Sequence, residues 1–225
     1  MRLYYMTDEK TALLILKDRR LKLSLFNEMN DPFELIAVNL QDRYQRQIAT
    51  ILKTHWAKTK GAICTSDNWE SPVMWAHYAR KHYGVCFGFD VPDDQDLIHK
   101  MLYTPERLQY ELDRAAERGG VTPEVVLEMF LTKGKAWEYE NEYRLTADLK
   151  EQDPDTGFYF VDFGPGLQLR EIVLGCRFNG SVDDVAKLVK HNAASVQVLR
   201  SRPAHGSFRM VQNKEVKPIT VKPQA

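Results

Sequence analysis

The chain has 225 residues, of which 44% are hydrophobic and 28% charged, a composition typical of a globular protein. Its 31 basic and 31 acidic residues give a net charge of zero, so no overall field attracts nucleic acid. Three cysteines without CxxC spacing argue against a disulfide framework and a zinc site, and no apolar run approaches the roughly 20 residues that span a bilayer. We therefore expect a reduced, cytoplasmic protein without metal or membrane segment. One domain is expected, with two small domains as the alternative.

The charge is distributed unevenly along the chain. From Arg200 onward the sequence contains six Lys or Arg and one acidic residue, Glu215. The net charge of this end is therefore about +5, and that of the preceding residues about −5. We expect a domain over residues 1–199 followed by a peripheral basic tail over 200–225. Two interpretations of the tail are open: a solvated end, or an arm that contacts nucleic-acid phosphates. A strand over Phe208–Val211 is the alternative structure for part of it.

The N-terminal quarter predicts alternating strands and helices. Asp8 can cap a helix that continues to Asp18. Leucines that alternate with polar residues over 21–25 predict a strand. The sequence NDPFE at 30–34 predicts a loop, because Pro32 disfavours the helical region for the residue before it. The other elements expected here are a strand over Leu3–Met6 and a helix from Leu40 to Lys58.

Helix-start signals recur in the rest of the chain. Ser71-Pro72 should begin a helix over Val73–Lys81, because Ser caps and Pro suits the first helical position. Thr104-Pro105-Glu106 and Thr122-Pro123-Glu124 repeat this signal, which predicts two helices flanking Gly119-Gly120. The other predicted elements are a helix from Ser181 to His191 and strands over Gly61–Ser66, Gly84–Phe89, Trp137–Ala147, Phe158–Phe163, Leu169–Leu174 and Ser195–Leu199.

The stretch from Pro72 to Phe89 is crowded with aromatic residues. Trp75 and Tyr78 combine a ring with a polar group, which suits the wall of a half-open pocket for a flat ligand. Ordinary core packing is expected for Met74, Ala79, Val85 and Phe87. No GxxxxGK[ST] or GxGxxG motif is present, so a nucleotide would have to be held in another way.

Charged residues cluster in WEYENEYR at 137–144. In a strand, four of them fall on one face and the aromatic residues on the other, which would anchor the strand in the core. Neighbouring carboxylates raise one another's pKa, and Arg144 can hold one of them ionised. Acid/base chemistry, a glycosidase pair or stabilisation of a cationic transition state all fit, as does a plain solvated edge. The charged face comprises Glu138, Glu140, Glu142 and Arg144.

The NDPFE loop has two interpretations as well. It is a simple turn before a helix, or it aims Asp31 or Glu34 into a site.

Taken together, several segments resemble a bacterial and phage family known as domain of unknown function 2971. The specific segments are MWAHYA at 74–79 and ENEYR at 140–144. Less specific matches are LYY at 3–5, NDPFE at 30–34, CTS at 64–66 and EIVLG at 171–175.

That family is similar, more distantly, to ADP-ribosyltransferases, which split NAD at the nicotinamide–ribose bond and pass ADP-ribose to an acceptor. The resemblance implies an α+β fold of mostly antiparallel split sheets, with helices packed around a central cleft. It also implies NAD as substrate, no metal, a nucleic-acid or protein acceptor, and a role in toxin or phage-conflict biology. The oligomeric state is left open.

The resemblance assigns roles to particular residues. Tyr78 is the helix tyrosine that stacks on nicotinamide, and Glu142 is the late glutamate that stabilises the ribose cation. Tyr5 departs from the family pattern, because it stands where His or Arg is expected. The second hypothesis is therefore a non-catalytic nucleotide- or nucleic-acid-binding module of the same fold, and the third a sugar hydrolase. The implied cofactor-binding set is Tyr5, Ser66, Trp75 and Tyr78, with Asp31, Glu34, Glu140 and Arg144 as substrate or loop residues.

Overall fold

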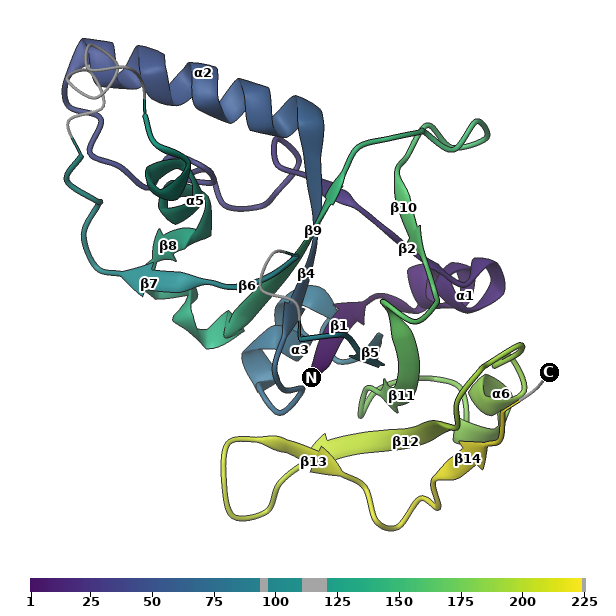
Figure 1. Ribbon diagram of the computed structural model, residues 1–225. Coiled ribbons are helices and arrows are strands. Elements are labelled where there is room, and N and C mark those ends of the chain that lie inside the picture. The colour runs from purple at the N-terminus through teal and green to yellow at the C-terminus, as the bar shows by residue number, and fades with distance from the viewer. Residues whose placement is uncertain (94–96, 111–120, 224–225) are drawn as a thin grey trace. The chain divides into compact units, whose positions relative to one another are not determined.

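The computed structural model of the chain describes residues 1–93, 97–110 and 121–223 (Figure 1). It is an α+β structure with a mixed, mostly antiparallel sheet, which confirms the predicted fold class at this level. The chain divides into two compact units. No helix among these described residues is long and apolar enough to cross a membrane. Unit 1 comprises Met1–Leu21, Thr65–Asp94 and Phe160–Ala225, and unit 2 comprises Lys22–Cys64 and Gln95–Tyr159.

Unit 1 is built on a sheet with the strand order β13-β12-β11-β5-β1-β4, and β14 also pairs with β12. The β11–β12 pair is parallel, and the other described pairs of this sheet are antiparallel. Strand β4 contributes only Thr65 and Ser66 to this unit. The strands are β1 (Arg2–Thr7), β4 (Lys60–Ser66), β5 (Val85–Asp90), β11 (Gln168–Leu174), β12 (Val196–Pro203), β13 (Met210–Gln212) and β14 (Ile219–Val221).

The strand register gives the unit 1 sheet two different faces. Tyr5 lies opposite Phe87, which lies opposite Ile172, and the last two are fully buried. Since side chains alternate along a strand, the neighbouring row falls on the other face. That row carries Tyr4, Gly88 and Glu171. The predicted strands over Leu3–Met6, Gly84–Phe89 and Leu169–Leu174 are confirmed.

Helices α1 (Glu9–Asp18) and α3 (Pro72–Tyr78) begin at the predicted caps. The Asp8 carboxylate accepts a hydrogen bond from Thr11 N at 3.0 Å, and Ser71 Oγ accepts one from Met74 N at 3.3 Å. Helix α3 ends three residues earlier than predicted. The reason is that Arg80, Lys81 and His82 adopt left-handed φ angles of 45°, 57° and 71°, which a right-handed helix cannot contain.

Two glycines allow strands of unit 1 to pass closely after this turn. A Cβ at Gly84 would lie 2.1 Å from Thr7 O, and one at Gly175 would lie 2.1 Å from His82 O. Gly175 N donates to Gly84 O at 3.0 Å. The two backbones therefore meet at a distance that only glycine permits.

The C-terminal region of unit 1 is folded into the sheet. Strand β12 continues to Pro203, so the expected boundary at residue 199 falls inside it. Strands β13 and β14 both pair with β12 (yellow-green and yellow in Figure 1). Helix α6 (Val182–Ala186) starts at the Ser181 cap, as predicted, but is shorter than predicted. A separate two-stranded sheet pairs β2 (Arg20–Lys22) with β10 (Phe160–Asp162).

Unit 2 combines an antiparallel set of strands with two helices. Strand β9 lies between β4 and β6, while β3 pairs with β4 and β7 pairs in parallel with β8. Helices α2 and α5 pack together through apolar side chains, including Ala49 and Met129. The elements are β3 (Ser24–Leu25), α2 (Arg43–Thr59), β6 (Ile98–Lys100), β7 (Leu102–Thr104), α5 (Pro123–Leu131), β8 (Thr132–Gly134), the 3-10 helix η1 (Lys135–Glu140) and β9 (Glu142–Asp148).

Three predictions for unit 2 differ from the structure. The strand expected over 21–25 is split into β2 and β3, because Leu23 N donates instead to Tyr159 O. Helix α2 starts at Arg43 rather than Leu40, because the Asp42 carboxylate caps it. The helix expected at Thr104 is wrong for residues 105–110, which are not helical; its continuation and Gly119-Gly120 lie outside the described residues.

Candidate functional site

The segment that contains Glu140 and Glu142 is not one continuous strand. Residues 135–140 form η1, and Asn141 turns the chain in a left-handed conformation with φ of 44°. Strand β9 begins only at Glu142, so the predicted common face of four charged residues is wrong. The faces are also inverted. Glu142 and Arg144 are 3% and 0% exposed, whereas Tyr143 is only partly buried.

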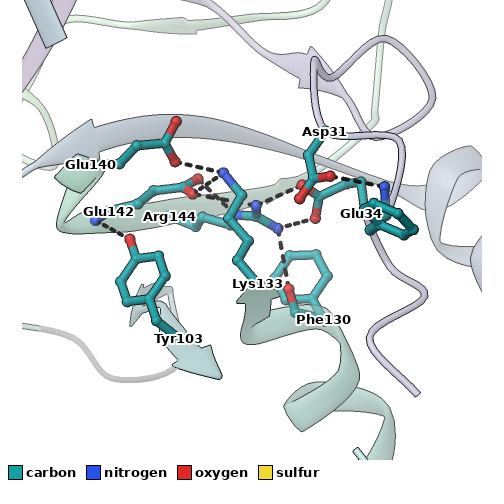
Figure 2. A network of polar contacts seen from close by, with 9 residues as sticks. Asp31, Glu34, Tyr103, Phe130, Lys133, Glu140, Glu142 and Arg144 are labelled. Atoms are coloured by element: carbon teal, nitrogen blue, oxygen red, sulfur yellow. Dashed lines mark hydrogen bonds and ion pairs between the residues drawn. The ribbon is translucent and has the colours of Figure 1, made fainter. Parts of the chain in front are cut away.

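Arg144 is the centre of a buried ion network in unit 2 (Figure 2). Its guanidinium forms a two-pronged ion pair with Glu34, with Nη1–Oε1 at 2.6 Å and Nη2–Oε2 at 2.9 Å. Nε donates to Glu142 Oε1 at 2.8 Å, and Nη2 reaches Glu142 Oε2 at 3.4 Å. Nη1 also donates to Phe130 O at 3.1 Å. All five N–H groups of the arginine therefore have acceptors.

Lys133 supplies the second cation of the network. Its Nζ lies 2.7 Å from Glu140 Oε2 and 2.6 Å from Glu142 Oε2, and the lysine is buried. Burial alone would lower the pKa of Lys133, but Glu142 and Glu140 raise it above its ordinary value. Strand β8 positions this lysine opposite Tyr103 of β7, whose hydroxyl accepts a hydrogen bond from Glu142 N at 2.8 Å.

The protonation state of Glu142 follows from these contacts. Burial by itself would raise its pKa, but Arg144 and Lys133 outweigh burial and lower the pKa to about 2. Glu142 is therefore ionised at neutral pH and cannot serve as a general acid there. In a glycosidase pair, which combines one ionised and one protonated carboxyl group, Glu142 could therefore serve only as the ionised partner.

The NDPFE loop delivers Glu34 to the network. Asp31 Oδ1 accepts a hydrogen bond from Phe33 N at 2.9 Å, and Glu34 N donates to Asp31 O at 3.1 Å. This tight turn, followed by the left-handed Leu35 with φ of 62°, places the Glu34 carboxylate against Arg144. The loop predicted over 30–34 is thus confirmed, and its glutamate points into a charged cluster.

Sequence reasoning missed several members of the network. Lys133, Tyr103 and the Phe130 carbonyl carry no motif, and the Cys64 thiol also faces Glu142. Burial and the Glu142 charge hold the pKa of Cys64 well above its ordinary value. The available signal was Lys133, which lies two residues after the apolar helix over 123–131, in the short strand that follows it.

The predicted residues of unit 1 have different environments. Trp75 is fully buried and its Nε1 donates to Trp69 O at 2.6 Å, so it belongs to the core and does not line an open pocket. Tyr78 is partly buried at the end of α3. Ser66 of β4 is buried and lies opposite Tyr4 of β1. Ser66 and Tyr5 therefore lie on opposite faces of the sheet.

The network has an excess of negative charge. Three carboxylates, Glu34, Glu140 and Glu142, face two cations, Lys133 and Arg144, which leaves a net charge of −1. Within the described part of the chain no cluster of His, Cys, Asp and Glu has the composition of a metal site. The chemistry that this arrangement offers is electrostatic, through a fixed, ionised carboxylate.

Residues 74–145 match the model of a family described as a protein of unknown function, DUF2971. The DUF2971 match covers 72 of the 225 residues and includes both MWAHYA and ENEYR, so it supports the resemblance drawn from those segments. Lys133, Glu140, Glu142 and Arg144 fall within it, whereas Glu34 does not. No curated protein and no solved structure matches the chain.

Proposed function

We propose that this protein is an ADP-ribosyltransferase-like enzyme that cleaves NAD and transfers ADP-ribose to a nucleic-acid or protein acceptor. The observation that carries the proposal is Glu142, an ionised carboxylate at the first position of β9. The resemblance implies a catalytic glutamate at the start of a late strand. It also implies a tyrosine on the helix after an earlier strand, and Tyr78 is the last residue of α3, which follows β4.

The chemistry requires a negative charge near the reacting ribose. The bond between ribose C1′ and the nicotinamide nitrogen breaks, and its electron pair leaves with the nitrogen, which becomes neutral. Positive charge develops on the ribose until an acceptor nucleophile bonds to C1′ and loses its proton. A carboxylate held ionised before the reaction stabilises this cation without reorganising. Lys133 and Arg144 keep Glu142 in that state.

A second candidate is a nucleotide-binding module of the same fold without turnover. The specific observation in its favour is that both oxygens of Glu142 already bind Arg144 or Lys133. A carboxylate engaged in this way organises its own unit. Tyr5, at the position where the family pattern has His or Arg, also favours this candidate.

The decisive experiment measures nicotinamide release from NAD by the purified full chain. Glu142→Gln should reduce turnover by about 10²–10³, the effect of losing one electrostatic stabiliser, with little change in NAD affinity. Tyr78→Ala should instead weaken NAD binding by roughly 1–3 kcal/mol through lost stacking and burial. Glu138→Gln, which changes an exposed carboxylate of η1, is the matched control and should leave both quantities unchanged.

The outcomes separate the candidates. Binding of NAD without nicotinamide release supports the binding module, and absence of both binding and release refutes the enzymatic proposal. If Glu142→Gln turns NAD over as fast as wild type, the assignment of Glu142 is wrong and Glu140 is tested next. Circular dichroism of each variant establishes that equal amounts of folded protein are compared.

A further inference from the structure

Unit 2 contains a pocket of about 250 Å³ beside the ion network. Its wall includes Asp31 and Phe33 from the NDPFE loop, Arg107, Lys133 of β8 and Trp137 of η1. Neither Glu142 nor Tyr78 lines it, although Lys133, which contacts Glu142, does. We infer that this pocket binds a single planar ring that bears an N–H donor, such as an amino- or amide-substituted heterocycle.

The aromatic wall of the pocket is exposed yet fixed. Phe33 is 55% exposed, so much of its ring is open to solvent on the pocket side of the loop. The Arg107 guanidinium lies 4.9 Å from the centre of its ring, and Arg107 Nη1 donates to Ile36 O at 3.2 Å and to Val38 O at 3.0 Å. The arginine therefore fixes the loop and the ring together. An exposed ring held in this way offers a stacking surface to a flat ligand.

Asp31 supplies an acceptor at the same pocket. It is 3% exposed, and its Oδ1 accepts the hydrogen bond from Phe33 N. Within the residues that the structure describes, Oδ2 has no hydrogen-bond or ion-pair partner. Figure 2 shows Asp31 on the loop that also carries Glu34. Because Asp31 lines the pocket, a ligand N–H group directed at Oδ2 would find a carboxylate acceptor there.

The charge around the pocket selects against anions. The neighbouring network carries a net charge of −1 and Asp31 adds −1, while Glu106 and Arg107 of the pocket wall cancel, so the total is −2. Lys133 lines the pocket, but its Nζ is held by Glu140 and Glu142, and Arg107 is held by backbone carbonyls. A phosphate or carboxylate would therefore meet repulsion, whereas a cation or a neutral N–H donor would be attracted.

The volume limits the size of the ligand. Pockets that enclose a drug-sized molecule measure roughly 300–1,000 Å³. At about 250 Å³ this pocket fits one ring system and its substituent, and it is too small for a whole dinucleotide. The ligand class is thus one donor-bearing ring, either free or as part of a larger molecule.

The test uses three probes with the same ring and different charge: benzamidine, benzamide and benzoate. Each is titrated into the full chain by calorimetry, while the indole N–H signal of Trp137 in NMR spectra reports the location. Benzamidine should bind more tightly than benzamide, and both should shift the Trp137 signal. Benzoate should bind at least about tenfold more weakly than benzamide, because its carboxylate faces Asp31.

Two variants and one control make the test specific. Asp31→Asn keeps an acceptor for Phe33 N but replaces Oδ2 by a donor, so benzamidine affinity should fall at least about tenfold. Phe33→Leu removes the exposed ring and should weaken the binding of all three probes about fivefold or more. Glu138→Gln, an exposed carboxylate outside the pocket wall, should leave affinity unchanged.

The inference is overturned if no probe binds saturably or if benzoate binds as tightly as benzamide. It is also overturned if both pocket variants bind like wild type. If Asp31→Asn does not fold, the affinity of Phe33→Leu for the probes tests the inference, because the exposed position of Phe33 tolerates substitution. Nicotinamide release from NAD is measured separately, so failure of the enzymatic proposal is distinguishable from failure of this one.

Discussion

Replacing Arg144 by methionine should strongly destabilise the protein. The change removes five hydrogen bonds and leaves Glu34 buried without a cation, because the ion pairs and side-chain hydrogen bonds of Glu34 within the described residues all go to Arg144. Glu142 retains Lys133. Breaking a buried ion pair by removing one partner costs about 3–5 kcal/mol. This is a large part of the roughly 5–15 kcal/mol by which a typical domain is stable.

The stranded charge can be removed by a second substitution. In wild type the network carries a net charge of −1, and Arg144→Met changes it to −2. Adding Glu34→Gln restores −1. The double variant should therefore recover about 1–2 kcal/mol relative to Arg144→Met alone, although Glu34→Gln by itself destabilises wild type.

Urea unfolding followed by circular dichroism measures these differences. Arg2→Met is the matched control: Arg2 also pairs with a carboxylate, that of Asp90 at 2.9 Å, but both side chains are more than a third exposed. It should cost less than about 1 kcal/mol. A cost below about 1 kcal/mol for Arg144→Met, or strict additivity of the two network substitutions, would refute the reasoning.

Two further predictions concern stability. The pKa of Glu142 is about 2 in the folded chain against its ordinary value of 4.5, so this carboxylate stabilises the fold above about pH 4.5. That contribution, about 3 kcal/mol, is lost as pH falls from 4.5 toward 2. Glu142→Gln should therefore flatten the pH dependence of the free energy of unfolding in this window. An unchanged slope would contradict the assignment. Gly175→Ala should destabilise the chain by about 3 kcal/mol in thermal or urea unfolding, because the new Cβ would lie 2.1 Å from His82 O. Gly166→Ala, with no atom within 4 Å of its Cβ position, serves as control, and equal effects of the two substitutions would disprove the close-approach argument.

Local chemistry made much of the fold predictable. Helix starts at Asp8, Ser71 and Thr122 depend on a side chain and a backbone N–H a few residues away, and all three form. The same type of signal failed at Thr104. There the Thr104 hydroxyl bonds with Glu106 in a local turn, and the chain does not continue as a helix.

The charged site was predictable only in part. The alternation in WEYENEYR suggested one strand, but the left-handed Asn141 separates a 3-10 helix from β9, and the tolerance of Asn for that conformation is the only sequence feature at the break. The buried position of Arg144 depends on Glu34, which is 110 residues away in sequence. Alternation within a segment shows which side chains share a face. It does not show which face is buried when the opposite charges come from elsewhere.

The division of the chain has a consequence for synthesis on the ribosome. Unit 1 takes β1 from residues 2–7, β5 from 85–90 and β12 to β14 from residues beyond 195, so its sheet joins segments that are far apart in the sequence. Unit 2 is complete once Tyr159 has been made. The sheet that contains β1 is therefore completed only after β12 to β14 have been made, while unit 2 can already fold, and such long-range closure is slow. Ribosomes stalled before residue 196 should hold a folded unit 2 and an unfinished unit 1.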